Sequence, residues 1–575
     1  MEFSSKFSIL LISLWLFTGC ETTESDTKPK KIKSTTISQD STETAVAGIS
    51  VEVMDASSDN YKVLKLNGDK KLQVKLGNEE KDLYVLFSNP ENSVHSATVQ
   101  HNQKISRSTN VIRKETIVND SKHPVAHASR YIQDFNNRVL DLQVSKKQDK
   151  KVKKSYRKIS DTEGFSTKDF YMEINSQNKK VTATARKVVS NIQTQYGKKS
   201  LTIWVENSAY GANCSKAKCV NEKMLNALAN KFLKSGSDND IYDWVTNVFG
   251  KEWGGSNSPL LIDESNHLSI LLTDIANDNK INGGVIGYFH SKDNFKNTKY
   301  VGSNERIMFY IDSVMFANAS NSWDENDFWP QQVFSTLAHE FQHMIYFYQK
   351  NVKQNLQGTE PWLNEMLSES TEDLVAVKMN VDGPRNVVAS RGDAGSKNNY
   401  NGRYPLFNQN NSLSPTSWDN SLANYSTVSS FGAYLLRNYG GAKLLHNVVD
   451  NNLINEEALM YAVHQHVNGK SKTFDDLIHE WGVAVLLSKR DDVSIDSGVL
   501  YNAGDFISSD FNGVHYDLGS INFFNYNIAP VLSANMGQVS PQSNYYYKVG
   551  ENLKGTIDLD ILNSRSLNVS VVVVK

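Results

Sequence analysis

With 575 residues, the chain is long enough for about three or four domains. Hydrophobic residues make up 39% of it, which is enough to fill globular cores. The formal net charge is −2, and this argues against a nucleic-acid partner, because such proteins carry a marked basic surplus.

The first 20 residues have the features of an export signal. Lys6 supplies the positive charge, and residues 7–17 form an almost uninterrupted apolar run that is too short to span a bilayer. The run ends in Phe17-Thr18-Gly19-Cys20, which resembles a bacterial lipobox with Phe where the strict pattern has Leu. The resemblance implies a lipoprotein signal peptide over residues 1–19 and lipidation of Cys20. The alternative is an ordinary signal peptide that is cleaved elsewhere.

An acylated Cys20 would anchor the exported protein to a membrane, at the cell envelope or the cell surface. Residues 20–45 are rich in Thr, Ser and Lys and predict a disordered tether. Residues 46–105 alternate polar and apolar side chains and include the apolar run 83–87. This pattern predicts a small N-terminal β-rich domain of the sandwich kind. Carbohydrate or partner binding, a spacer and a pro-segment all stay open as its role.

Residues 106–165 form a junction between the β-rich segment and the rest of the chain. A helix is predicted over residues 131–142. The run KKQDKKVKKSYRK at residues 146–158 holds eight basic residues against one acidic residue. Such a run is typical of a solvated linker, and binding to anionic lipid or cell-wall polymer is the alternative.

From residue 166 the pattern changes to alternating strands and helices. Residues 201–205, 268–272 and 307–311 predict strands, and residues 221–234 predict an amphipathic helix. We therefore expect a sheet that packs against the helix following its last strand.

Two smaller features lie in this region. Cys214 and Cys219 are the cysteines that remain beside Cys20, and in an exported protein they could close a local disulfide. The loop 274–279 is rich in Asp and Asn and could hold Ca²⁺, although it matches no EF-hand register. A turn stabilised by Asx side chains is the alternative.

The sequence STLAHEFQH at residues 335–343 contains the HExxH pattern as His339, Glu340 and His343. On a helix, residues four apart lie one turn apart on the same face, so both imidazoles can bind one ion. Glu340 points about 100° away from His339 and can reach a water on that ion. Pro330 marks the start of a helix with an apolar stripe, and unpaired histidines would be costly in its buried face. Helix-surface histidines without a ligand are the alternative.

A catalytic zinc ion takes three protein ligands and keeps one open position. The HExxHxxGxxH pattern is excluded, because Tyr and Gln stand three and six residues after His343. A second helix, announced by Pro361, carries Glu365, Glu369 and Glu372 at helical spacing. Glu365 follows His343 by 22 residues, which is enough for a loop and an antiparallel return. Its carboxylate can therefore reach the metal.

HEFQH at residues 339–343, followed by NEMLSE at residues 364–369, resembles the thermolysin-type pairing of HExxH with NExxSD in gluzincin metallopeptidases. The wider runs LAHEFQHMI and WLNEMLSE are most similar to the hyicolysin-type neutral metalloproteases. The resemblance covers roughly residues 165–490. It implies a zincin-like fold and Zn²⁺ as the cofactor.

Carried over position by position, the resemblance makes Glu365 the third zinc ligand. Asn364 would support His343, and Glu369 would orient His339 from behind. Glu369 stands where the family has Asp, so this arm is longer by one methylene.

The region downstream of the second metal helix is expected to supply the oxyanion-stabilising group, since gluzincins commonly use a Tyr or His there. We select Tyr425, in a helix predicted over residues 424–439. The alternatives are His446, His464, His466 and His479. The polar stretch 382–421 is long for a loop and could line the substrate cleft.

Residues 491–575 contain tyrosine- and valine-rich segments that predict a C-terminal β-rich domain. The expected fold is thus α+β, with a zincin-like metallopeptidase domain at residues 166–490 flanked by β-sandwich-like domains.

The expected activity is zinc-dependent endopeptidase cleavage of extracellular proteins. Zinc held by His339, His343 and Glu365 would activate a water and polarise the scissile carbonyl. Glu340 would take the proton of the water and deliver it to the leaving amine. The alternative is a surface adhesion lipoprotein with a catalytically idle zincin fold. The intact His, Glu, His and Glu positions argue against it, because an idle fold needs no base beside the ligands.

Overall fold

The computed structural model describes residues 51–102, 130–138, 159–174, 177–319, 321–388, 392–398 and 402–575. The chain divides into two compact units, Met1–Gly48 and Ile49–Lys575, and every described residue belongs to the second unit. The predicted signal peptide with Cys20, the tether and the basic run at 146–158 lie outside the described residues.

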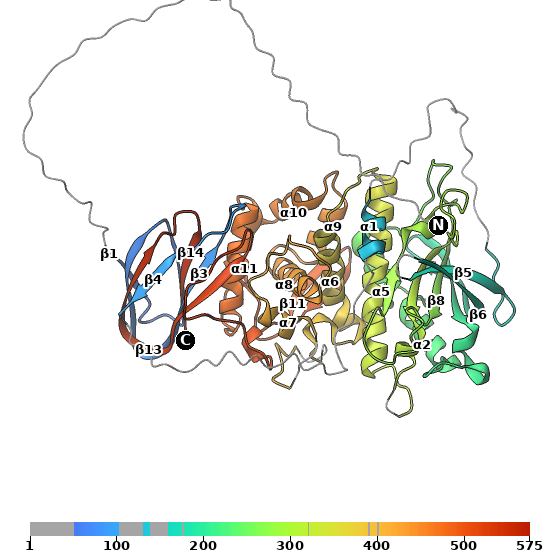
Figure 1. Ribbon diagram of the computed structural model, residues 1–575, viewed down its shortest axis with the longest axis horizontal. Helices are drawn as coiled ribbons and strands as arrows, with labels where there is room; N and C mark the ends of the chain where they lie inside the picture. The colour runs from blue at the N-terminus through green and yellow to red at the C-terminus, as the bar shows by residue number, and fades with distance from the viewer. Residues whose placement is uncertain are drawn as a thin grey trace, which may run out of the picture. The chain divides into compact units, whose positions relative to one another are not determined.

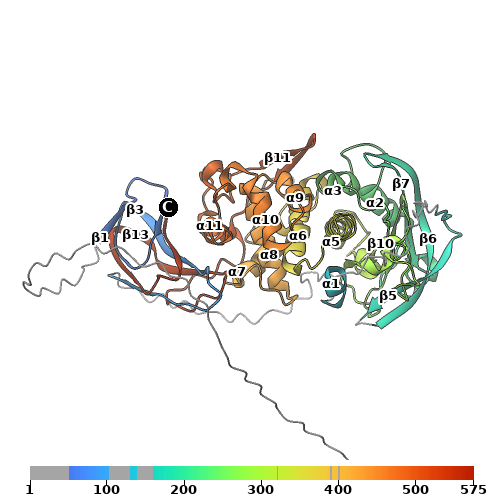
Figure 2. The same ribbon diagram turned by 90° about the horizontal axis from the view of Figure 1, so that it is seen from above.

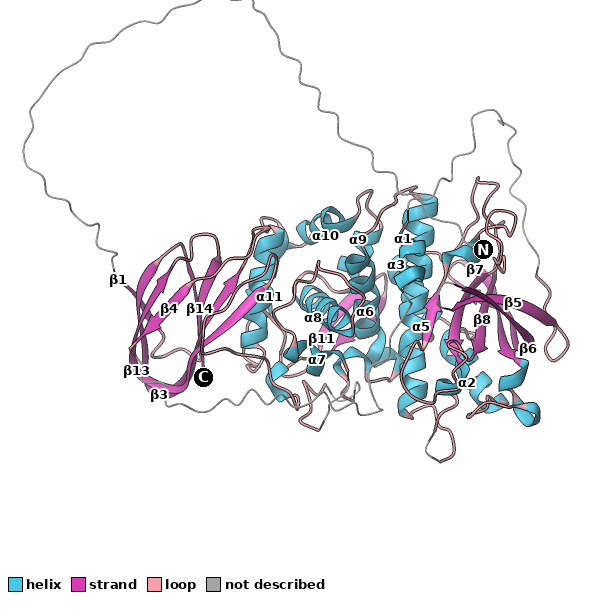
Figure 3. Cartoon of the chain, in the orientation of Figure 1, coloured by secondary structure: helices cyan, strands magenta, loops and turns pink. Residues whose placement is uncertain are grey.

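Helices and strands both contribute to the described chain, which confirms the predicted α+β class (Figure 3). The strands are β1 (Val51–Asp55), β2 (Tyr61–Leu66), β3 (Lys70–Ser88), β4 (Thr98–His101), β5 (Thr167–Ile174), β6 (Gln177–Thr194), β7 (Gly197–Glu206), β8 (His267–Thr273), β9 (Gly287–Phe289), β10 (Ile307–Asp312), β11 (Ile507–Phe511), β12 (Val514–Leu518), β13 (Asn544–Leu562) and β14 (Asn568–Val574). The helices are α1 (Arg130–Asn137), α2 (Glu222–Phe232), α3 (Ile241–Phe249), α4 (Ser313–Phe316), α5 (Phe328–Tyr346), α6 (Pro361–Met379), α7 (Arg403–Gln409), α8 (Leu422–Asn438), α9 (Ala442–Val449), α10 (Asn455–His464) and α11 (Phe474–Leu487). Among these helices, none combines the length and the apolar character that crossing a bilayer requires.

Strands from the two ends of the described chain form one sheet. Its order is β2-β14-β3-β13-β4, and β1 pairs in parallel with β3. Figure 1 shows the blue strands from the start of the described chain beside the red strands from its end. The sequence pattern predicts two separate β-rich domains, residues 46–105 and 491–575, whereas their strands pair in one sheet. Strand pairing over such a distance leaves no local signal, because each strand pattern records only which faces are buried.

The apolar run at residues 83–87 shows that this part of β3 is buried on both faces of the sheet. Leu83, Val85 and Phe87 lie in a core enclosed by the sheet, together with residues of β13 and β14. Tyr84 and Leu86 point to the opposite face and join the core of the helical region. Successive side chains of a strand point to opposite faces, so a strand buried on both sides reads as a continuous apolar run.

His479 on α11 connects the sheet to the helical region. Its Nδ1 lies 2.7 Å from Ser88 Oγ on β3, and its Nε2 lies 2.7 Å from Ser570 Oγ on β14. The imidazole is 2% exposed. Burial lowers the pKa of His479 to about 3, so the folded protein holds this side chain neutral.

This contact predicts a loss of stability in mild acid. The unfolded chain protonates His479 below its usual pKa of 6.5, whereas the folded chain does not until the pH is about 3. The stabilisation is therefore complete above pH 6.5 and falls by about 1.4 kcal/mol for each pH unit below it. Relative to His479→Gln, the wild-type protein should lose about 2 kcal/mol between pH 7.5 and pH 5, measured by urea unfolding.

The comparison with His479→Gln removes the contributions of other groups. Burial raises the pKa of Asp240 and that of Asp312 to about 7, and both carboxyls are present in the two proteins. If the free energy of unfolding changes with pH in the same way in wild type and His479→Gln, the buried contacts of His479 do not keep its side chain neutral.

The second six-stranded sheet positions the metal helix. Its order is β5-β6-β7-β8-β10-β9, with β7, β8 and β10 parallel and β9 antiparallel at the edge. Helix α5 contacts β9 and β10, and Figure 2 shows α5 next to β10. The strands predicted at 201–205, 268–272 and 307–311 are β7, β8 and β10.

Helices α5, α6 and α8 form the layer that carries the site residues. Helix α6 contacts α5 on one side and α8 on another. Gly432 permits the approach of α8, since a Cβ at this position would lie 2.2 Å from Ser370 Oγ on α6. At the end of α5 the chain continues through a π-helical segment, η4 (Phe347–Lys353), before it turns toward α6.

Candidate metal centre

The HExxH residues lie in the middle of a helix that is buried over most of its length. Helix α5 is buried continuously from Val333 to Tyr346. His339 and His343 lie one turn apart, with ring centroids 4.8 Å from each other. Since this helix is enclosed on all sides, its imidazoles need partners from neighbouring elements.

Helix α6 supplies these partners and runs antiparallel to α5. It begins at Pro361, whose ring fits the first helical position and whose missing N–H costs nothing there. Glu365 Oε2 lies 3.2 Å from His339 Nε2 and 3.5 Å from His343 Nε2. One carboxylate oxygen of Glu365 therefore faces the Nε2 atom of each imidazole ring.

The other ring nitrogen of each histidine faces an acceptor. His339 Nδ1 lies 2.8 Å from Glu372 Oε1, and His343 Nδ1 lies 3.1 Å from Asn364 Oδ1. An oxygen acceptor places the ring proton on Nδ1, which leaves the lone pair of the neutral imidazole on Nε2. Both lone pairs are then directed toward Glu365.

Glu372 makes the contact that the family resemblance assigns to Glu369, and this corrects the prediction. On an antiparallel helix pair, the partner of His339 must lie further along α6 than Glu365. Glu372 follows Glu365 by seven residues, which is almost two helical turns, so it lies about 20° around the helix from Glu365. Glu369 follows Glu365 by four residues and lies about 40° around the helix in the other direction. The seven-residue spacing between Glu365 and Glu372 could therefore have identified Glu372 as the partner of His339.

Glu369 instead pairs with Arg403 on α7. The guanidinium contacts both carboxylate oxygens, at 2.6 Å and 3.0 Å, and all of these atoms are buried. Arg403 also lies over the ring of Tyr425, 5.2 Å from its centroid. Arg403 is not among the residues predicted from the sequence, because it lies in the stretch 382–421, which the sequence predicts to be a loop.

Two groups of described residues could each hold a metal ion. One is His339, His343 and Glu365, and the other is His339, Glu369 and Glu372, with ligand atoms within 4.8 Å of one another in each. The first group contains two imidazoles and one carboxylate, which is a ligand set of catalytic zinc sites. In the second group the positive charge of Arg403 already faces Glu369, so a cation is disfavoured there.

The electrostatics of the first group also fit a cation. Burial opposes ionisation of Glu365, but the charge of His343 and the contact with His339 outweigh burial and lower the pKa of Glu365 to about 2. Burial likewise opposes the charge on His339, yet Glu365 and Glu372 raise its pKa well above the usual value. The surrounding carboxylates thus favour positive charge at this point, and a bound zinc ion would supply it.

Glu340 lies beside this group on α5 and is held by the edge of the sheet. The backbone N–H of Phe289 on β9 donates to Glu340 Oε2 at 2.7 Å. Burial raises the pKa of Glu340 above its usual value. The carboxylate is therefore close to the ligands and fixed at one oxygen.

Tyr425, near the start of α8, is also brought to the metal centre. Its hydroxyl accepts a hydrogen bond at 2.5 Å from Gln133 Nε2, which also donates to Glu365 Oε1 at 2.7 Å. The four histidines considered as alternatives form contacts elsewhere: His446 with Val248, His464 with Lys472, His466 with Asn468, and His479 with Ser88 and Ser570.

Comparison with known proteins supports the same class of site. The model of the family described as peptidase M30 matches residues 178–497, which is more than half of the chain. The chain belongs to the peptidase M30 family. The match contains α5, α6 and α8 and begins after α1.

Individual proteins also match this M30 family member, at 12–25% identity. The "Neutral metalloprotease ShpI" of Staphylococcus hyicus is 25% identical over 319 residues, which are 55% of this chain and 60% of the relative. The chain thus matches about three fifths of that relative's length. A crystal structure of an M1 zinc metallopeptidase from Deinococcus radiodurans matches with a TM-score of 0.28 and 13% identity, over 55% of this chain and 60% of the other. A two-domain M1 zinc metallopeptidase bound to L-arginine matches with a TM-score of 0.27 and 12% identity, over the same shares.

The stretch 382–421 of this M30 family member is only partly a loop. Helix α7 lies within it and carries Arg403. Trp418, near its end, packs edge-on against Tyr425 with ring centroids 5.0 Å apart. The stretch therefore contributes to the wall of the metal centre.

The remaining predicted features lie away from the metal centre. Cys214 and Cys219 form a disulfide, with Cα atoms 5.9 Å apart. In the loop proposed for calcium, Asp274 accepts the backbone N–H groups of Asp278 and Asn279, and Lys216 Nζ lies 2.9 Å from it. An ammonium group and an Asx-stabilised turn thus satisfy Asp274, and the calcium prediction is not supported.

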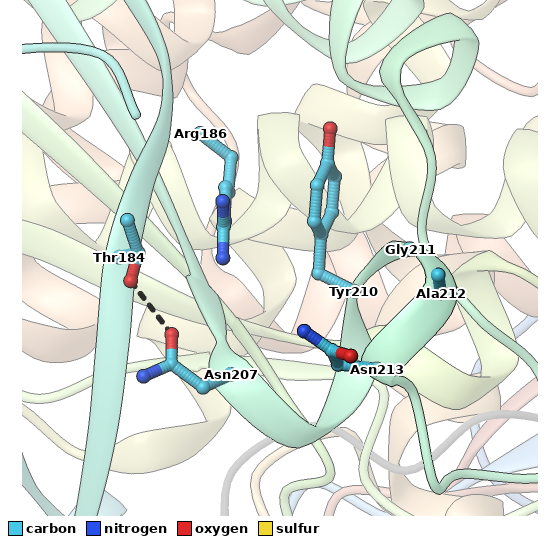
Figure 4. Close-up of a pocket in the computed structure, with 7 residues that line it drawn as sticks. All are labelled: Thr184, Arg186, Asn207, Tyr210, Gly211, Ala212 and Asn213. Carbon is cyan, nitrogen blue, oxygen red and sulfur yellow. Dashed lines mark hydrogen bonds between the residues drawn. The ribbon is translucent and has the colours of Figure 1, made fainter. Parts of the chain in front are cut away.

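A cavity of about 420 Å³ lies beside the disulfide loop. Figure 4 shows Arg186 and Tyr210 side by side at this cavity, and the guanidinium carbon is 4.5 Å from the ring centroid. The lining residues are Thr184, Arg186, Asn207, Tyr210, Gly211, Ala212 and Asn213. They include no carboxylate or imidazole, so this cavity offers no group for metal-assisted hydrolysis.

Proposed function

We propose that the protein is a zinc-dependent endopeptidase that cleaves peptide bonds of extracellular proteins. The observation that carries this proposal is the convergence of His339 Nε2, His343 Nε2 and Glu365 Oε2 in a buried site, with Glu340 beside them. When bound there, zinc would supply a Lewis acid that polarises the scissile carbonyl and acidifies a water.

Glu340 acts as the proton carrier. Its carboxylate accepts a proton from the attacking water and delivers that proton to the nitrogen of the leaving amine. Burial raises the pKa of Glu340, which brings its proton affinity closer to what transfer in both directions needs near neutral pH. The hydrogen bond from Phe289 N–H holds one oxygen, so the carboxylate keeps a fixed orientation.

The other residues orient the ligands and the substrate. Glu372 and Asn364 hold the Nδ1 protons of His339 and His343, which keeps both Nε2 lone pairs toward the metal position. The Tyr425 hydroxyl, close to Glu365 through Gln133, would donate to the carbonyl oxygen as negative charge develops on it.

Export and lipid anchoring at Cys20 are proposed from residues 1–20 alone. The mass of the mature N-terminus after membrane extraction decides between an acylated Cys20 and ordinary signal cleavage.

Metal analysis combined with casein hydrolysis tests the proposed activity. The full chain should bind one zinc ion, cleave casein, lose this cleavage when a chelator removes the zinc, and regain it when zinc is returned. Cleavage that persists in zinc-free protein would contradict the proposal.

A further inference from the structure

Helix α1 covers the metal centre although it precedes the region that matches the M30 family model. Figure 2 shows α1 beside α5. Gln133 is 4% exposed, and its Nε2 donates to both Glu365 Oε1 and Tyr425 OH, at 2.7 Å and 2.5 Å. Its Oε1 accepts from Trp418 Nε1 at 3.2 Å. The whole amide of Gln133 is thus held inside the site.

The next turn of α1 occupies the edge of the sheet. Asn136 Nδ2 donates to Phe289 O at 2.9 Å, and Asn136 Oδ1 accepts from Ser291 N at 2.8 Å. One side-chain amide therefore pairs with the carbonyl of the last residue of β9 and with an N–H two residues further along the chain, as the backbone of an added strand would. Asn137 Oδ1 also accepts from Asn364 Nδ2 at 3.3 Å.

Apolar contacts hold the same face of α1 in place. Ile132 is 2% exposed and joins the core on the outer side of the sheet. Phe135 packs edge-on against His290 and Tyr300, with ring centroids 4.6 Å and 5.2 Å away. The opposite face of α1 is in solvent, where Asp134 is exposed.

We propose that α1 is an intramolecular inhibitor that occupies the substrate position of the metal centre. The inference rests on the proposed function, because Gln133 of α1 contacts Tyr425, which that function assigns to the substrate carbonyl, and Glu365, which it assigns to the metal. Gln133 contacts Oε1 of Glu365, whereas both histidines face Oε2. Zinc binding and inhibition by α1 are therefore compatible, and α1 lowers the peptidase activity of the zinc-loaded chain for as long as it stays docked.

The helical form of α1 explains why the segment can stay in the site without being cleaved. The hydrogen bonds that α1 makes to the site come from its side chains, and its backbone stays coiled in the helix. A peptide that pairs with a sheet edge must be extended. Side-chain amides of Gln133 and Asn136 therefore fill the polar positions while the peptide bonds of α1 remain in the helix.

The test is the affinity of a zinc-binding peptide hydroxamate for the zinc-loaded full chain, measured by calorimetry. Gln133→Ala should bind the hydroxamate about 10- to 100-fold more tightly than wild type, since the lost contact is a hydrogen bond to a carboxylate. Casein kcat/KM should rise in the same variant. Asp134→Ala on the exposed face is the matched control and should behave as wild type.

Equal hydroxamate affinities in wild type, Gln133→Ala and Phe135→Ala would overturn the inhibitor proposal and leave the proposed function standing. If the chain takes up no zinc, the proposed function fails instead. The docking of α1 is then tested by the rate of trypsin cleavage after Arg138, whose guanidinium lies 3.6 Å from the Phe135 ring centroid. Gln133→Ala and Phe135→Ala should be cut several-fold faster, and equal rates would overturn the proposal in zinc-free protein too.

Discussion

Replacement of Glu340 with Gln is expected to lower kcat for casein by about 10²- to 10⁴-fold, the usual contribution of a proton-transferring group. Glutamine keeps the size of the side chain, and its amide oxygen can still accept from Phe289 N–H. It cannot take the proton of a water. Zinc content and thermal stability should therefore stay close to wild type.

The measurement is best made in the Gln133→Ala background as well as in wild type, so that α1 does not mask the change. Glu325→Gln is the matched control, because Glu325 is exposed in the loop before α5 and undergoes the same chemical change. Retained casein hydrolysis in Glu340→Gln would remove Glu340 from the reaction.

Replacement of Glu365 with Gln is expected to weaken zinc binding by more than about 100-fold. Loss of an outer partner of a metal ligand already costs roughly 10- to 100-fold, and loss of a charged ligand costs more. Because the carboxylate with a pKa of about 2 becomes neutral, the two imidazoles lose the negative charge that favours a cation. Zinc per chain, measured after dialysis against a competing chelator, should fall to near zero.

Glu369→Gln separates the two groups of residues that could hold an ion. If His339, His343 and Glu365 form the site, Glu369→Gln keeps its zinc, because Glu369 belongs only to the second group. Circular dichroism must accompany this measurement, since the change leaves buried Arg403 facing a neutral side chain. Zinc loss in folded Glu369→Gln, with zinc retained in Glu365→Gln, would assign the metal to the second group.

Helix patterns predicted the two metal helices well. HExxH is a local pattern, so helical geometry alone places His339 and His343 on one face of the helix. Pro361 marks the start of α6 because the proline ring fixes φ at a value that suits the first turn of a helix. Glu365 could be selected for the same reason, since the loop length permits an antiparallel return. Placement of Tyr425 beside the metal centre rested on family resemblance, because no local pattern links α8 to α5.

Contacts between distant segments could not be predicted from helical periodicity or loop length. Glu369 and Glu372 lie on the same helix, and the choice between them depends on the register of α5 against α6. Arg403 reaches Glu369 across 34 residues, and Gln133 reaches Glu365 across 232 residues. Nothing in the sequence around Gln133 marks it, because an amide side chain on an amphipathic helix is ordinary until its position in the fold is known.

The sequence by itself determined the chemistry that this protein can carry: two imidazoles and a carboxylate at zinc-ligand spacing, with a second carboxylate one residue after the first histidine. These follow from the period of a single helix and the length of a single loop. Only the tertiary structure decided that strands from both ends of the described chain share a sheet, that Glu372 orients His339, and that α1 lies over the metal centre. The physical reason is that packing and hydrogen bonding between distant segments depend on three-dimensional register, which local periodicity does not encode.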